Sequence, residues 1–153
     1  MANTYTQIHI QAIWAVQNRD CLIGKAWKEE LHKYITGIVQ NKGHKMLKIN
    51  SVEDHVHMFF GMRPIEALSD IMKIVKQEST NWINEKGVLR AKFSWQAGFG
   101  GFSYAKSQVP QVIRYVENQE EHHKTKTFIE EYVEFLDAFE VEYDKRYIFK
   151  PVL

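Results

Sequence analysis

The sequence Asp54-His55-Val56-His57-Met58-Phe59-Phe60 places two histidines, one residue apart, at the start of a short run of residues that favour β-strands. Side chains alternate between the two faces of a strand, so His55 and His57 point to one side and the apolar side chains between and after them point mainly to the other. Two imidazoles on one side of a rigid strand form a pre-positioned pair of metal ligands. The alternative interpretation is a polar edge strand whose two histidines are solvated.

The residues around this stretch alternate or repeat in patterns that predict further elements. The predicted strands cover Tyr5–Val16, Lys45–Val52 and His55–Met62. The last two are joined by a tight connection at Glu53-Asp54, which indicates an antiparallel hairpin. The predicted helices cover Lys25–Asn41, which stops before Gly43, and a segment that opens at Pro64 and ends at Gly87. Gln17-Asn18-Arg19-Asp20 reads as a turn.

The second half of the chain is predicted to contain one strand and two helices. Residues 93–103 are rich in aromatic residues and glycine, which predicts an interrupted strand over Phe93–Gln96 and Gly101–Tyr104. One helix is predicted from Pro110 to about His122, and a last one over Phe128–Phe139, with Thr127 and Glu130 as a capping box. Tyr147-Ile148-Phe149 is predicted to be a short strand or an arm.

The order strand, helix, strand, strand, helix, strand predicts an α+β fold with a ferredoxin-like antiparallel sheet. Helices are expected mainly on one face of the sheet, which leaves the other face for a ligand or a second subunit. No repeat or linker divides residues 1–153, so a single domain is expected.

The composition excludes several classes of protein. With 44% hydrophobic and 25% charged residues, the chain is expected to fold into a globular core. The first residues lack the basic and apolar regions of a secretory signal, and no apolar run approaches the roughly 18 residues of a membrane helix. The single cysteine, Cys21, excludes an intrachain disulfide and fits a cytoplasmic location.

The net charge of +1 hides an asymmetry along the chain. Residues 1–116 contain fifteen Lys and Arg and nine Asp and Glu, a net charge of +6. Residues 117–153 contain five and ten, a net charge of −5. A basic body with an acidic C-terminal segment permits a polyanionic partner without requiring one.

Tyr115 and Gln119 lie four residues apart on the predicted helix that starts at Pro110, so they share one face. With His55 and His57 they would give one divalent ion two imidazole nitrogens and an amide oxygen, with a phenol one helical turn away. Taken alone, the two residues are better explained as a half-buried tyrosine and a solvated glutamine.

Four segments, in this order and spacing, resemble the IS200/IS605-type single-tyrosine transposases of the HUH endonuclease superfamily. The segments are Asp54–His57, Val75–Ile83, Trp95–Ser103 and Tyr115–His123, and the similarity continues from Phe128 to Tyr147. The resemblance implies that His55 and His57 bind the metal ion, that Gln119 is its third ligand, and that Tyr115 is the nucleophile.

The same resemblance implies a homodimer, with no membrane association, that cuts and rejoins single-stranded DNA at the hairpin-bearing ends of a mobile element. The tyrosine helix of one subunit can complete the active site of the other in that family. Two alternatives share the fold: a domesticated relative that acts on repeated palindromes, and a catalytically silent hairpin-binding protein. A plain ferredoxin-like RNA- or ligand-binding module with an incidental histidine pair is a further alternative.

The remaining expectations concern the ion and the DNA. Mixed nitrogen and oxygen ligands suit Mn²⁺ or Mg²⁺, and Zn²⁺ is kept as an alternative identity of the ion. Asp54 is interpreted as a turn residue or as a partner that orients an imidazole. His122 and His123 are interpreted as surface residues, with a DNA phosphate contact or stabilisation of the helix end as the alternatives. The candidate DNA contacts are basic or aromatic residues that can meet phosphates or stack on bases: Lys73, Lys76, Arg90, Lys92, Trp95, Phe99 and Phe102. Each aromatic residue, taken by itself, is more typical of the core.

Overall fold

Four antiparallel strands form one sheet in the order β2–β3–β1–β4 in the computed structural model, which describes residues 3–18 and 22–150. The strands are β1 (His9–Ala15), β2 (Lys45–Ser51), β3 (His55–Gly61) and β4 (Gly100–Tyr104). The helices are α1 (Lys25–Asn41), α2 (Leu68–Lys86), α3 (Val109–Glu117), α4 (Gln119–His122) and α5 (Phe128–Ala138), with a 3₁₀ turn, η2 (Lys106–Gln108), before α3. This is the predicted ferredoxin-like order, and β2 and β3 form the predicted hairpin.

Strand β3 lies inside the sheet, where β1 pairs with one edge and β2 with the other. His57 is opposite Ile13 of β1 and Asn50 of β2, and His55 is opposite Ala15. Backbone hydrogen bonds on both sides therefore fix the direction of the two imidazoles. The interpretation as a solvated edge strand is excluded by this position.

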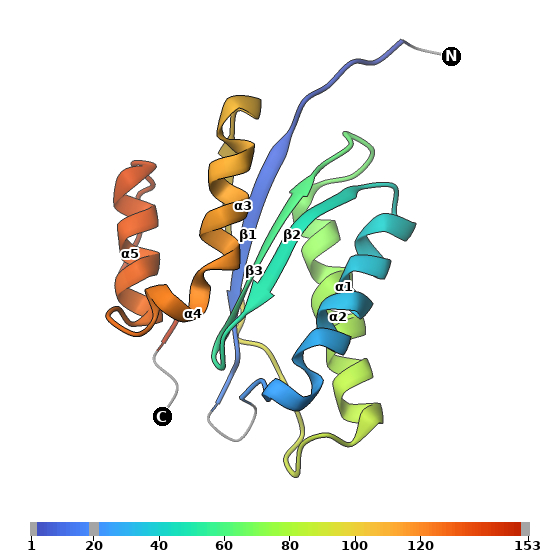
Figure 1. Ribbon diagram of the computed structural model, residues 1–153, viewed down its shortest axis with the longest axis vertical. Coiled ribbons are helices and arrows are strands. Elements are labelled where there is room, and N and C mark those ends of the chain that lie inside the picture. Colours follow the sequence, from blue (N-terminus) through green and yellow to red (C-terminus); the bar gives the residue numbers. More distant parts are fainter. Residues whose placement is uncertain (1–2, 19–21, 151–153) are drawn as a thin grey trace.

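The two long helices, α1 and α2, cover one face of the sheet (Figure 1). Val56, Met58 and Phe60 of β3 are fully buried against them. Their partners from the helices are apolar residues at helical spacing: Leu31, Ile35, Ile71, Met72 and Val75. The alternation read from the sequence thus directs the apolar half of β3 into the main core.

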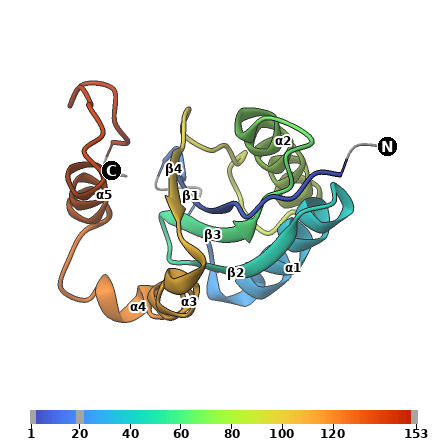
Figure 2. The same cartoon turned by 90° about the horizontal axis from the view of Figure 1, so that it is seen from above.

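The opposite face, expected to be open, carries α3 and α5 (Figure 2). Phe59 of β3 forms a second, smaller apolar cluster with Val112 and Val116 of α3. Phe135 of α5 packs against the rings of Phe102 and Tyr115. The amphipathic C-terminal helix buries its apolar face here, which explains why the face is covered.

The boundaries of several elements differ from those predicted, and β1 begins at His9 and not at Tyr5. Helix α2 begins at Leu68 and not at Pro64, because Glu66 in the preceding loop is held by His44 and Lys42 at 2.7 and 3.0 Å. The strand predicted at Phe93–Gln96 is reduced to one bridge, between Trp95 and Val16, before β4. The predicted turn at residues 17–20 and Cys21 lie partly or wholly outside the described residues.

The helix predicted from Pro110 to His122 is interrupted at Asn118, which separates α3 from α4. The side-chain amide of Asn50, on β2, donates to the carbonyls of Val116 and Glu117 at 2.9 and 3.1 Å. These bonds satisfy the last carbonyls of α3, as a C-terminal cap does, and so favour its end here. Tyr115 and Gln119 consequently lie on two consecutive helices.

The C-terminal helix α5 spans Phe128–Ala138 and carries the predicted capping box between Thr127 and Glu130. The tail that follows is an arm, in which Phe149 is buried against Phe128 and Tyr132. In the part of the chain that the structure describes, no helix combines the length and the apolarity that crossing a bilayer requires.

We expect His32 of α1 to make stability depend on pH. Its Nε2 lies 2.8 Å from Ser51 Oγ, and burial lowers its pKa from 6.5 to about 4. The unfolded chain therefore binds a proton more readily, so the stabilisation is complete above pH 6.5 and is lost as the pH falls towards 4. Between about pH 7 and about pH 5, wild-type protein should lose about 2 kcal/mol more unfolding free energy than His32→Gln. Urea titrations at the two pH values measure this, and equal losses in both proteins would contradict it.

Candidate functional site

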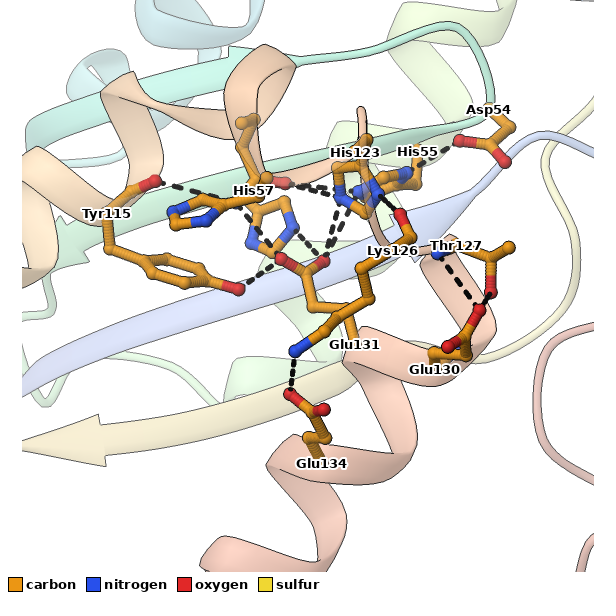
Figure 3. A network of polar contacts seen from close by, with 12 residues as sticks. Asp54, His55, His57, Tyr115, His123, Lys126, Thr127, Glu130, Glu131 and Glu134 are labelled. Carbon is orange, nitrogen blue, oxygen red and sulfur yellow. Dashed lines mark hydrogen bonds and ion pairs between the residues drawn. The ribbon is translucent and has the colours of Figure 1, made fainter.

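The imidazoles of His55 and His57 lie side by side, fully buried, with ring centroids 5.0 Å apart. Nδ1 of His55 lies 2.7 Å from Asp54 Oδ1, and Nδ1 of His57 lies 2.6 Å from Gln11 Oε1. Both Nδ1 atoms are held by acceptors outside the pair, which leaves both Nε2 atoms directed to the same region (Figure 3). Asp54 is thus both a turn residue and the partner that orients His55.

Tyr115 and Gln119 reach the same region from α3 and α4. Gln119 is fully buried, and its Oε1 lies 3.3 Å from Nε2 of His55. The ring of Tyr115 lies 6.0 Å from that of His57, between centroids. The structure therefore brings together all four residues singled out by sequence, within one chain.

Glu131 of α5 lies at the centre of this group, and sequence reasoning missed it. Its Oε1 is 3.0 Å from Nε2 of His57, while its Oε2 accepts hydrogen bonds from the Tyr115 hydroxyl and, at 3.2 Å, from the Gln119 amide (Figure 3). One signal in the sequence could have found it: Glu131 falls on the apolar stripe that Phe128, Tyr132 and Phe135 form along α5. An acidic residue on a buried helix face needs a partner.

The prediction that His122 and His123 are surface residues is wrong. Nε2 of His123 lies 3.0 Å from Gln119 Oε1 and 3.2 Å from Glu131 Oε1, inside the cluster. The ring of His122 stacks on Tyr115, with centroids 4.6 Å apart. The bend between α3 and α4 turns both rings inward, which a continuous helix pattern did not indicate.

The electrostatics of the cluster follow from burial and from these contacts. Burial by itself raises the pKa of Glu131, but hydrogen bonds with His123, His55 and His57 outweigh it and hold that pKa well below its usual range. Burial lowers the pKa of His57 to about 4, and burial together with the neighbouring Glu131 charge raises the pKa of Tyr115. In this state Glu131 is a carboxylate and Tyr115 keeps its proton.

The chemistry of these groups fits a divalent cation. His55, His57, His123 and Glu131 offer ligand atoms that all lie within 4.8 Å of one another. Imidazole nitrogens and a carboxylate oxygen are common ligands of divalent transition-metal ions. Such an ion, with the Tyr115 hydroxyl nearby, would give a nucleophile and an electrophilic centre in one site.

Two cavities border the cluster. One of about 530 Å³ lies between the start of α1, the β2–β3 turn and the α4–α5 connection, and its lining includes Lys25, Lys28, Asp54, His123 and Lys126. Another of about 230 Å³ is lined by residues that include Gln11, Tyr104, Tyr115 and Phe135. The histidine end and the tyrosine end of the cluster therefore each adjoin a cavity.

The candidate DNA contacts lie apart from this cluster. Lys73 and Lys76 belong to α2, on the opposite face of the sheet, and the Lys76 amine donates to the carbonyls of Gln96 and Gly98 at 2.8 and 2.6 Å. The ring of Trp95 is buried, and its Nε1 donates to Ser79 Oγ at 3.0 Å. Lys76 and Trp95 thus act within the fold in this structure, and Phe102 is likewise buried. Lys73, Arg90 and Lys92 are exposed.

We expect Asp54→Ala to weaken the binding of a divalent ion about 10-fold, because His55 loses the acceptor that fixes its ring and its proton. The affinity can be measured by calorimetric titration of chelator-treated protein with Mn²⁺. Glu53→Ala, in the same turn but exposed, is the matched control and should bind as wild type does. Equal affinities for all three proteins would show that Asp54 does not support the site.

Comparisons with known proteins bear on the family and the fold of the chain. A family model described as "Transposase IS200 like" matches residues 4–119. No curated protein sequence matches the chain. Two solved structures share its fold, each with a TM-score of 0.60. One is a presumed transposase of Deinococcus radiodurans R1, with 18% identity over 78% of this chain and 95% of the other. The second is a REP-associated tyrosine transposase bound to a REP hairpin, with 12% identity over 80% and 73%.

The match of the family model covers the whole sheet, the imidazole pair, Tyr115 and Gln119, and it ends before His123 and Glu131. It extends over more than half of the chain, and the solved structures support the same fold. The protein belongs to the IS200-like transposase family.

Proposed function

We propose that this protein is a metal-dependent transposase that cleaves and rejoins single-stranded DNA through a covalent bond to Tyr115. The observation that carries the proposal is the convergence, in one chain, of the Tyr115 hydroxyl with the imidazoles of His55 and His57. Family membership supports the reaction class, and the fit of a divalent ion to the cluster supports metal dependence.

In the proposed reaction the Tyr115 oxygen attacks the scissile phosphorus, and the bond from phosphorus to the 3′-oxygen breaks. The products are a 5′-phosphotyrosine and a free 3′-hydroxyl. The Tyr115 hydroxyl donates to Glu131 Oε2, which is placed to receive its proton, and the departing 3′-oxygen takes up a proton from solvent water. A divalent ion held by His55, His57 and Gln119 would compensate the charge that develops at the phosphate.

The covalent intermediate is a phosphate diester like the one it replaces, so the free energy of the broken bond is retained. The 3′-hydroxyl of another strand can attack it and release Tyr115, which joins two DNA ends without ATP. This reversibility distinguishes strand transfer from hydrolysis. The apolar rings of Phe128 and Phe135 pack against His55 and Tyr115 at this site.

We propose hairpin-bearing DNA ends as the substrate. The structure of the REP-associated tyrosine transposase with its hairpin supports this choice, and the net charge of +6 over residues 1–116 favours a polyanion. Lys73, Arg90 and Lys92 stay predicted phosphate contacts. Because they lie away from the cluster, they would hold the duplex part of a hairpin and not the scissile phosphate.

The homodimer expected from the resemblance also stays a proposal. Strands β2 and β4 form the two edges of the sheet, and an edge strand can pair with its counterpart in a second copy. Light scattering coupled to size-exclusion chromatography determines the mass directly. A mass of twice 18.1 kDa is expected.

The domesticated relative is the second candidate function, and the same hairpin-bound neighbour favours it. It uses the same chemistry on palindromes repeated along a chromosome. The silent hairpin-binding protein would bind the same DNA without forming a covalent bond. One cluster contains the complete set of His55, His57, Tyr115 and Gln119. This completeness favours a catalytically active protein over the silent binder.

We expect Tyr115→Phe to bind a labelled hairpin oligonucleotide as wild type does and to form no covalent adduct, because the attacking oxygen is gone. Wild-type protein with Mn²⁺ or Mg²⁺ should give an adduct that survives denaturing electrophoresis and disappears with EDTA. Tyr34→Phe is the control, since Tyr34 stacks on Trp82 at the far side of the sheet. An adduct with Tyr115→Phe would refute the assignment of the nucleophile, and wild-type binding without any adduct would favour the silent binder.

A further inference from the structure

The proton of each imidazole in the cluster can be assigned from its partners. His123 Nδ1 lies 2.8 Å from the Lys126 carbonyl, which can only accept, so this nitrogen carries the hydrogen. His55 Nδ1 faces the Asp54 carboxylate in the same way, and His57 Nδ1 faces the Gln11 amide oxygen. With Nδ1 held in this way, Nε2 is the atom of each ring that is placed to bind an ion.

The three Nε2 atoms face one carboxylate oxygen. Glu131 Oε1 lies 3.0 Å from Nε2 of His57, 3.2 Å from that of His123 and 3.5 Å from that of His55. Gln119 Oε1 adds another oxygen, 3.0 Å from Nε2 of His123. These groups lie close enough to share protons, or to share one metal ion in place of those protons.

One divalent ion can bind these atoms together, because metal binding displaces the protons of its ligands. Ligand atoms about 2.1 Å from an ion lie about 3.0–4.2 Å apart. This range includes the three separations from Glu131 Oε1, and all the ligand atoms of the group lie within 4.8 Å of one another.

We propose that Glu131 joins a transition-metal ion to Tyr115, with Oε1 as a ligand of the ion and Oε2 as the acceptor of the Tyr115 hydroxyl, and that His123 is the third imidazole ligand. This inference rests on the proposed function for its metal ion and extends the ligand set beyond His55, His57 and Gln119. Both added residues lie outside the residues that the family model matches.

The ligand set defines the class of ion. Three imidazole nitrogens with one carboxylate and one amide oxygen suit Mn²⁺, Zn²⁺ and similar ions, whereas Mg²⁺ prefers oxygen ligands and retains several waters. The protein is therefore expected to bind Mn²⁺ well in the absence of DNA and to discriminate against Mg²⁺.

The proposal also links the ion to helix α5. Glu131 lies in its first half, and the ring of Phe128, one turn earlier, stacks on His55 with centroids 4.0 Å apart. A bond from Glu131 to the ion would add a polar anchor to this apolar packing. Ion binding should therefore stabilise α5 specifically.

The first test measures Mn²⁺ affinity by the electron paramagnetic resonance signal of the free ion, with chelator-treated protein. Glu131→Gln and His123→Ala should each bind Mn²⁺ at least about 10-fold more weakly than wild type. Glu134→Gln, one turn from Glu131 but exposed, should bind normally. Thermal unfolding of the apo proteins verifies that every variant is folded.

The second test follows hydrogen exchange of the α5 amides. Mn²⁺ should slow exchange across residues 128–138 in wild type and in Glu134→Gln, and should leave it unchanged in Glu131→Gln. This readout detects the link to α5 without any DNA or catalytic activity.

Three results would overturn the proposal: unaltered Mn²⁺ affinity in Glu131→Gln and His123→Ala, no Mn²⁺ binding by wild type, or Mg²⁺ binding as tight as that of Mn²⁺. The adduct assay with Tyr115→Phe tests the proposed function separately. An adduct formed by wild type together with unaltered affinities would leave the transposase in place and refute the ligand role. The expected affinities without any adduct would support the ligand role and refute the reaction.

Discussion

The buried carboxylate of Glu131 imposes the strictest constraint on this structure. An ionised carboxylate away from water costs several kcal/mol unless it is paired, and here its partners are three imidazoles, a phenol and an amide. Those partners come from β3, from α3 and α4, and from the connection that follows. The packing of helix α5 against the sheet therefore depends on the same contacts that form the site.

The sheet supplies the rigidity that this convergence needs. Strand β3 is paired on both sides, so the directions of His55 and His57 are fixed by backbone hydrogen bonds and not by side-chain packing alone. Gln11, on the neighbouring β1, holds His57 and in turn donates to the Tyr104 hydroxyl at 2.9 Å. The ligand pair is thus oriented by two neighbouring elements, β1 and the turn that carries Asp54. A pre-organised site of this kind loses little conformational entropy when it binds an ion or a phosphate.

Local patterns account for what the sequence predicted correctly. The alternation across His55–Phe60 depends only on strand geometry, and the capping box at Thr127 depends on four consecutive residues. The errors arise where distant residues intervene. Asn50 caps α3 from another element, so the continuous helix through Tyr115 and Gln119 is divided. A distant contact of this kind also occurs at Lys76, a predicted DNA contact, because the fold brings the carbonyls of Gln96 and Gly98 to its amine.

Glu131 was not predicted as a site residue because it lies among other acidic residues in the C-terminal segment. Its neighbours on α5 have local roles, since Glu130 completes the cap with Thr127 and Glu134 pairs with Lys126 at 2.6 Å. The three carboxylates contribute equally to the net charge, yet only that of Glu131 faces the imidazoles, and those of Glu130 and Glu134 face solvent. The distinction lies in the helical period, which places Glu131 between Phe128 and Phe135 on the buried face. Residues 4–119 contain the predicted nucleophile and ligands, but the carboxylate that contacts both comes from the segment that follows, so the chemistry of the site is a property of the whole chain.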